Sequence, residues 1–138
     1  MSFRHNKDLP EGVTRIGHFF ALPFEGKKIE NVSRFLSFFT FNMNDRTVEL
    51  QLNSDYFILV HGEQYQVHGL DFDFKDFLEF SIKDKLVTKA RSDQYGTLEI
   101  HIEGDIVIIV DDDPFETWHY SDKEKRIYIH GGCGRFIC

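Results

Sequence analysis

Short segments in which apolar and polar residues alternate constrain the fold of this chain more than any other feature. The alternation covers residues 39–43 and 48–52, with Asn44-Asp45 between them. Residues 98–102 alternate in the same way and are followed by Glu103-Gly104-Asp105. A period of two places the apolar side chains on one face of a β-strand. Because Asn, Asp and Gly favour the turns that join strands, the pattern predicts two β-hairpins.

The return strand of the second hairpin, residues 106–110, is apolar at every position. A strand of this kind is typical of the middle of a sheet, where other layers cover both faces. We therefore expect residues 106–110 to lie centrally, with both faces buried.

The two hairpins also look like copies of one unit. A shift of 59 residues places Phe39, Phe41 and Met43 on Leu98, Ile100 and Ile102. The lead-in segments before the two hairpins are similar as well, once an insertion is allowed. This correspondence indicates an internal repeat.

Between the two units, residues 71–80 have the spacing of a short amphipathic helix. Its expected apolar face consists of Phe74, Phe77, Leu78 and Phe80. After the second hairpin, residues 115–120 and 126–130 are predicted to form two further strands, joined by the charged turn 121–125.

These elements predict an α+β fold, mostly antiparallel β-sheet built from two similar hairpin units, with one short amphipathic helix between them. A length of 138 residues and 41% apolar content suit a single domain, residues 1–138. We divide it into an N-terminal arm (1–23), a first β-unit (24–60), the helix (71–80), and a second β-unit with the C-terminal strands (82–138).

The charge balance excludes one class of partner. With 16 Lys and Arg against 23 Asp and Glu, the net charge is −7. Because this charge repels the phosphate backbone of DNA and RNA, we expect no nucleic-acid partner. The sequence shows neither a signal-peptide pattern nor an apolar run of about 20 residues that would span a membrane. We therefore expect a cytoplasmic protein in which Cys133 and Cys138 are reduced.

Motifs for cofactors and common catalytic centres are absent from the sequence. It contains no phosphate-binding glycine loop, calcium loop or standard zinc-ligand spacing. We predict no catalytic residue, no metal site and no cofactor. The alternative is a small metal-dependent or thiol hydrolase that uses Asp111, Asp112, Asp113, His119, His130 and Cys133.

One group of motifs resembles a bacterial family of uncharacterised domains. The matching features are Gly96-x-Leu98-x-Ile100-x-Ile102-x-Gly104, the segment Asp112-x-x-Phe115-Glu116-x-Trp118, and the late Gly131-Gly132. Family members carry a Gly-x-Leu-x-Leu-x-Phe hairpin, an aromatic-Glu-x-Trp segment and a Gly-Gly pair. This chain has Ile102 where the family usually has Phe, and His130 where Pro often precedes the glycines. Some similar domains are encoded beside polymorphic toxin genes and look like immunity proteins.

The net charge of −7, together with the absence of a catalytic constellation, predicts a non-enzymatic protein-binding domain. The resemblance implies the immunity type, in which an acidic surface blocks a basic toxin. The expected partner-binding residues are Asp111, Asp112, Asp113, Glu116 and Trp118. The expected structural motif consists of Phe115, Glu116, Trp118, Gly131 and Gly132. Glu116 is predicted to accept hydrogen bonds from the Gly131-Gly132 backbone, whereas Phe115 and Trp118, three residues apart, cannot share one face of a regular strand. A third hypothesis is a structural domain that oligomerises through a sheet edge.

Overall fold

The computed structural model describes residues 9–35, 38–43, 47–67 and 74–137. The side chains of residues 34–42 and 74–76 lie outside this description. Most of the described chain consists of antiparallel strands, with a single described helix. The predicted fold class is therefore confirmed at this level.

The smaller sheet has five strands in the described residues, in the order β12-β11-β5-β4-β3. Every neighbouring pair is antiparallel. The strands are β3 (Ile29–Phe35), β4 (Phe38–Met43), β5 (Val48–Leu52), β11 (Trp118–Asp122) and β12 (Ile127–Gly131).

The larger sheet has seven strands in the described residues, in the order β1-β2-β8-β9-β10-β6-β7, and is also antiparallel. The strands are β1 (Thr14–Ile16), β2 (Phe19–Ala21), β6 (Tyr56–Val60), β7 (Glu63–Val67), β8 (Val87–Asp93), β9 (Leu98–Ile102) and β10 (Ile106–Val110). In this sheet β6 and β7 extend the meander β8-β9-β10, as β11 and β12 extend β3-β4-β5 in the smaller sheet.

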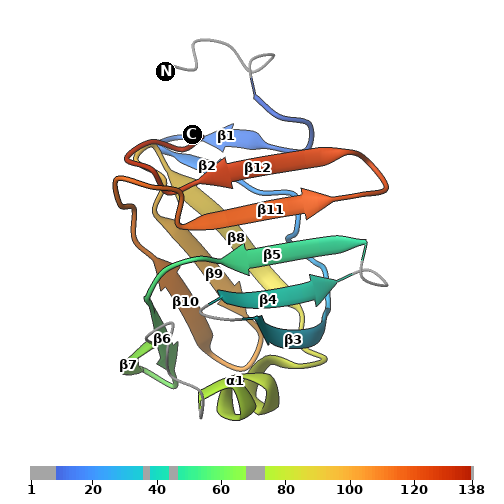
Figure 1. Cartoon of the computed structure of the whole chain (residues 1–138), viewed down its shortest axis with the longest axis vertical. Helices are drawn as coiled ribbons and strands as arrows, with labels where there is room; N and C mark the ends of the chain where they lie inside the picture. The colour runs from blue at the N-terminus through green and yellow to red at the C-terminus, as the bar shows by residue number, and fades with distance from the viewer. Residues whose placement is uncertain (1–8, 36–37, 44–46, 68–73, 138) are drawn as a thin grey trace.

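The two sheets pack face to face, and their strands cross at a steep angle (Figure 1). Every second residue of β5, β9 and β10 is buried, as the alternation predicts. These side chains form one core between the sheets, in which Trp118, Tyr120, Tyr56, Phe24 and Phe136 are the largest buried groups. Within the described residues, each sheet therefore has an inner apolar face and an outer face that no further sheet covers.

Both predicted hairpins are present, β4 with β5 and β9 with β10, but they lie in different sheets. Strand β10 occupies the middle of its sheet between β9 and β6, as expected. The expectation that both of its faces are covered is wrong. Val107 and Ile109 on its outer face stay partly exposed, together with Phe57 and Leu59 on β6.

Residues 14–21 are an integral part of the larger sheet, because β2 pairs with β8 and β1 pairs with β2. Phe20 and Leu22 are buried, whereas Ile16 is 64% exposed. Residues 1–8 of the predicted arm lie outside the described residues.

The helix α1 (Phe74–Ile82) lies at one end of the molecule and packs against β3 (Figure 1). Residues 71–73 of the predicted helix lie outside the described residues. The predicted apolar face is only partly right. Leu78 and Ile82 are buried, whereas Phe77 and Phe80 are 42% and 88% exposed. In the described part of the chain, no helix has the length and apolar character needed to cross a membrane.

Candidate functional site

Two histidines face each other on the outer side of the smaller sheet. The register of the β11-β12 hairpin places His119 directly opposite His130. Their ring centroids are 4.6 Å apart with the planes tilted by 31°. The turn that joins the strands is fixed by the Asp122 carboxylate, which accepts a hydrogen bond from the Lys125 N–H at 3.1 Å. The backbone ladder and this turn therefore determine the distance between the rings.

Glu116 joins the two histidines from the loop before β11. Its Oε2 lies 2.8 Å from Nδ1 of His130. The loop is held against the sheet on both sides, because Thr117 N–H donates to Gly131 O at 3.0 Å and Asn53 N–H donates to Thr117 O at 2.8 Å. The predicted hydrogen bond from Glu116 to the glycine backbone is therefore wrong. Thr117 makes the backbone contact, and the Glu116 carboxylate pairs with a side chain.

Each of the three residues offers one ligand atom, and these atoms lie within 4.8 Å of one another. All three side chains are partly exposed; those of His130 and Glu116 are 44% and 42% accessible. Two imidazole nitrogens and a carboxylate oxygen are ligands that zinc and related ions accept. The cluster therefore has the donors that a divalent transition metal requires.

The electrostatic environment keeps His119 neutral. Burial, followed by the neighbouring His130, lowers the pKa of the His119 ring below its ordinary value of 6.5. The carboxylates of Glu116 and Glu49 oppose this shift but do not reverse it. A neutral imidazole has a free lone pair, so the ring is held in the form that can bind a cation.

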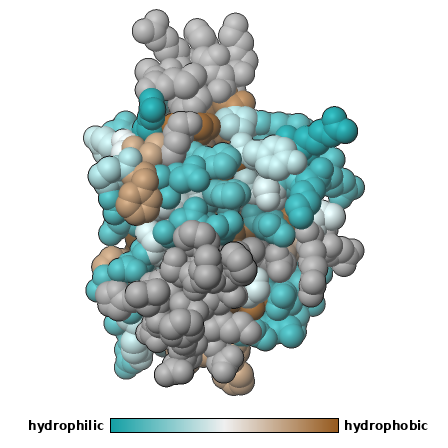
Figure 2. All heavy atoms as spheres, viewed as in Figure 1, coloured by the Kyte–Doolittle hydropathy of each residue, from teal (hydrophilic) through white to brown (hydrophobic). Residues whose placement is uncertain are grey.

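The surface around the cluster is polar. On the face of the smaller sheet that Figure 2 shows, the described residues are mostly hydrophilic. Gln51 on β5 lies opposite His119 across the strand pair. Beside it, Glu49 forms an ion pair with Lys123 at 3.7 Å.

Asp111, Asp112 and Asp113 are exposed, as predicted, in the loop between β10 and β11. They do not belong to the three-residue group with the histidines. Asp113 N–H donates to Gly132 O at 2.7 Å, so the loop backbone is fixed to the segment after β12. Phe115 in the same loop is 55% exposed.

The prediction that Trp118 binds a partner at the surface is wrong, because its side chain is fully buried. Its indole Nε1–H donates to Gly96 O at 2.8 Å, in the turn between β8 and β9 of the other sheet. Gly131 lies opposite Trp118, and a Cβ at that position would collide with the indole Cζ2. A Cβ on Gly96 would come within 2.7 Å of Gly132 N. The glycines and the tryptophan of the motif therefore meet in one tightly packed contact that joins the two sheets, with Phe115 on the surface beside it.

Cys133 is disulfide-bonded, and the chain's other cysteine, Cys138, lies outside the described residues. The expectation that Cys133 is reduced, which followed from the cytoplasmic prediction, is therefore wrong. A disulfide-bonded sulfur has no thiolate to attack a substrate, so a hydrolase with Cys133 as nucleophile is excluded in this state.

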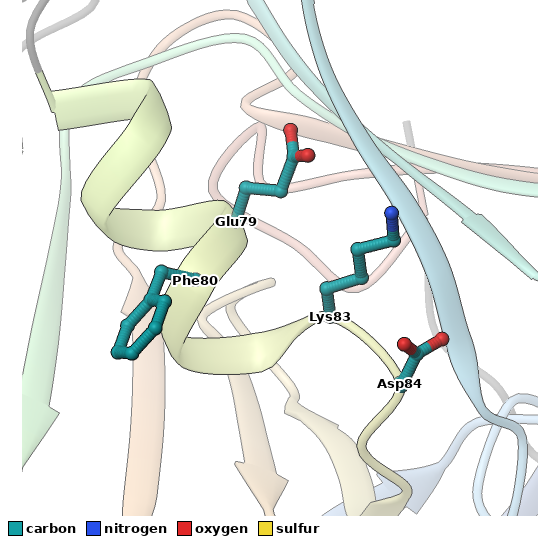
Figure 3. A pocket seen from close by; sticks show the side chains of 4 residues that line it. All are labelled: Glu79, Phe80, Lys83 and Asp84. Atoms are coloured by element: carbon teal, nitrogen blue, oxygen red, sulfur yellow. The ribbon is translucent and has the colours of Figure 1, made fainter.

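A shallow pocket of about 400 Å³ lies elsewhere, at the C-terminal end of α1. It is lined by Glu79, Phe80, Lys83 and Asp84, and Figure 3 shows Phe80 pointing away from Glu79 and Lys83. The described residues that line this pocket include no hydroxyl, thiol or imidazole group. The histidine cluster is the stronger candidate site.

Sequence reasoning singled out His119 and His130 but did not place them together. The predicted turn, centred on residue 123, would set His119 opposite Ile127. The observed ladder pairs His119 with His130 because the turn is centred between Glu124 and Lys125. The contact between Glu116 and the histidines was not predicted, because a regular strand over residues 115–120 would place Glu116 on the opposite face from His119. The strand begins only at Trp118, so the preceding loop can direct Glu116 outward.

No protein-family model, no curated protein and no solved structure matches this chain. The resemblance to an immunity-like family therefore stays a prediction.

Proposed function

We propose that this chain is a protein-binding domain of the immunity type, which neutralises a basic toxin. The observation that carries the proposal is the exposed loop from Asp111 to Phe115, which presents three carboxylates next to an aromatic side chain. We call Asp111, Asp112, Asp113 and Phe115 the acidic loop.

The acidic loop has the chemistry of a recognition surface. None of its three aspartates forms an ion pair with a described residue of this chain, so their charge is available to a partner. Complementary charge accelerates association and selects among partners. An exposed aromatic side chain such as Phe115, at 55% exposure, can supply the buried contact that stabilises the complex.

The backbone of the acidic loop is already held in place. Asp113 N–H is bonded to Gly132 O, and Thr117 N–H is bonded to Gly131 O. A loop that is ordered before binding loses less conformational entropy in the complex. These contacts support a preformed binding surface.

The proposal is tested by affinity capture from cells of the source organism, followed by reconstitution of the complex from the purified partner. We expect a basic protein in a stoichiometric complex. Phe115→Ala should weaken its Kd about 10-fold or more. The triple variant Asp111→Asn/Asp112→Asn/Asp113→Asn should lower the association rate about 10-fold at low salt.

A matched control removes three exposed carboxylates outside this loop, through Glu11→Gln, Asp105→Asn and Glu124→Gln. Asp105 precedes β10 and Glu124 follows β11, so a whole strand separates each of them from the loop. This variant has the same net charge as the triple aspartate variant, so it separates a local contact from the general field. Equal decreases of the association rate in the two triple variants would contradict the proposal. The absence of any basic protein from the captured material would contradict it as well.

We further propose that the two β-units are copies of one ancestral unit. The meander β3-β4-β5 followed by β6-β7 has the same strand arrangement as β8-β9-β10 followed by β11-β12, and each trailing hairpin joins the other unit's sheet. The pairing Phe39↔Leu52 has its counterpart in Leu98↔Val110. Each meander also carries a register irregularity near the start of its first strand. In an experimental structure, the two units should superimpose strand for strand.

A further inference from the structure

We propose that Glu116, His119 and His130 form a binding site for one divalent transition-metal ion of the zinc class. This site needs no protein partner. It shares no residue with the acidic loop, and it would bind a metal ion where the acidic loop would bind a protein. It also differs from the predicted absence of a metal site.

The ligand atoms are already close to the arrangement that an ion needs. Zinc binds imidazole nitrogen and carboxylate oxygen at about 2.0–2.2 Å, which places the ligands of a tetrahedral site about 3.4 Å apart. The three ligand atoms here lie within 4.8 Å of one another. Because the side chains of His130 and Glu116 are 44% and 42% accessible, small side-chain rotations can close the remaining gap.

The positions of the ligands are set by two rigid attachments. His119 and His130 come from directly paired positions of a β-ladder. Glu116 comes from a loop whose next residue, Thr117, is bonded on both sides to backbone groups. Three protein ligands leave a fourth position on the solvent side, which water can occupy.

The cluster carries no fixed positive charge of its own. In the described residues, the Glu116 carboxylate pairs with His130 and with no Lys or Arg. A bound divalent ion would therefore neutralise the Glu116 carboxylate, which has no Lys or Arg partner among the described residues. The nitrogen ligands favour Zn²⁺, Co²⁺ or Ni²⁺ over Ca²⁺ and Mg²⁺, which prefer oxygen-only sites.

The chain contains a natural control on its other sheet. His101 contacts Glu99 at 2.5 Å, and the side chain of His101 is 34% accessible. The third member there is Arg91, which lies 3.2 Å from Glu99 and already supplies a cation. This His-Glu pair should not bind zinc, because a guanidinium cannot act as a ligand.

The test is titration of the purified full chain, without a histidine tag, with Zn²⁺ by isothermal titration calorimetry. We expect one zinc ion per chain. Glu116→Gln, His119→Gln and His130→Gln should each weaken the Kd about 10-fold or more, since they remove a ligand. His101→Gln should leave the Kd unchanged. Circular dichroism of each variant checks that it is folded.

Two further readouts locate the ion. Co²⁺ should give the visible absorption of a low-coordinate site with the wild type and lose it with His119→Gln/His130→Gln. The imidazole NMR signals of His119 and His130 should shift on addition of Zn²⁺, while those of His101 stay in place.

The proposal is overturned by the absence of saturable zinc binding. It is also overturned by binding that survives the double histidine variant, since the ion would then lie elsewhere. Ca²⁺ binding that competes with Zn²⁺ at equal concentration would contradict the assigned ion class. None of these outcomes depends on whether a basic protein partner exists.

Discussion

Each sheet contains a three-stranded meander extended by a two-stranded hairpin, yet the outer faces of the two sheets have different chemistry. Each outer face carries a His-Glu pair: His101 with Glu99 on the larger sheet, and His130 with Glu116 on the smaller one. The third member is Arg91 in the first case and His119 in the second.

The identity of the third residue decides what each pair can do. Arg91 is always charged, so Glu99 belongs to an ion pair that is complete within the chain. In the described residues, Glu116 contacts His130 and forms no ion pair with Lys or Arg, so we propose that this pair takes its cation from outside the chain. We therefore propose that the third side chain decides whether a His-Glu pair is satisfied within the chain, as at Arg91, or open to a metal ion, as at His119.

The Trp118-Gly131 contact gives the largest expected effect. Gly131→Ala places a Cβ against the indole ring and should lower the free energy of unfolding by about 3 kcal/mol. In the larger sheet, the corresponding pair of the hairpin β6-β7 is Tyr56↔Val67, so a β-branched valine stands where the smaller sheet has Gly131. Urea unfolding measures the change.

Gly134→Ala is the matched control for this prediction. Gly134 has φ of +84°, but a Cβ there would meet no atom within 4 Å. Gly134→Ala should lower the free energy of unfolding by about 1 kcal/mol, which is the conformational strain alone. If Gly131→Ala and Gly134→Ala lowered the free energy of unfolding equally, the collision with Trp118 would not be the cause of the destabilisation.

Tyr120 marks a second difference between the sheets. It pairs with Leu50 in the smaller sheet, whereas the matching position in the larger sheet is Ile58, paired with Ile108. The Tyr120 hydroxyl is buried without a hydrogen-bond partner in the described residues, and burial raises the pKa of Tyr120. Tyr120→Phe should therefore raise the unfolding free energy by up to about 1 kcal/mol, measured by thermal or urea unfolding.

Tyr128→Phe on the neighbouring strand is the control, because its side chain is 59% exposed. It should change stability by less than about 0.5 kcal/mol. Destabilisation by Tyr120→Phe would mean that the hydroxyl makes a favourable interaction after all.

The Glu99 ion pair gives the smallest expected effect. Partial burial alone would raise the pKa of the Glu99 carboxyl, but the hydrogen bond to His101 and the Arg91 guanidinium lower it below 4.5. A carboxyl with a lowered folded-state pKa stabilises the fold at neutral pH, and this stabilisation is lost as the pH falls through that pKa. The difference in unfolding free energy between wild type and Glu99→Gln should therefore shrink below about pH 4.5.

A double-mutant cycle with Arg91→Met and Glu99→Gln isolates the pair. The coupling energy at pH 7 should be about 0.5–1 kcal/mol and should decrease with added salt. A coupling energy of zero at low salt would remove the distinction that we draw between the two His-Glu pairs.

The central hairpins could be predicted because their pattern is local. Alternation over residues 98–102 and a turn at Gly104 specify a strand and its return without reference to the rest of the chain. The helix was harder, since its apolar residues do not define one face. In the structure, α1 packs against β3, Leu78 and Ile82 belong to the core, and Phe80 stays exposed.

The sequence by itself determined that the alternating segments form β-strands with one apolar face, since a period of two does not fit a helix. The short turns between these segments determined that the strands pair antiparallel. Only the tertiary structure decided which residues meet across those strands. A turn centred between residues 124 and 125 set His119 opposite His130, and a loop held by Thr117 brought Glu116 to them. These contacts depend on the register of the final hairpin and on a loop outside any strand, neither of which is encoded in the spacing of apolar residues.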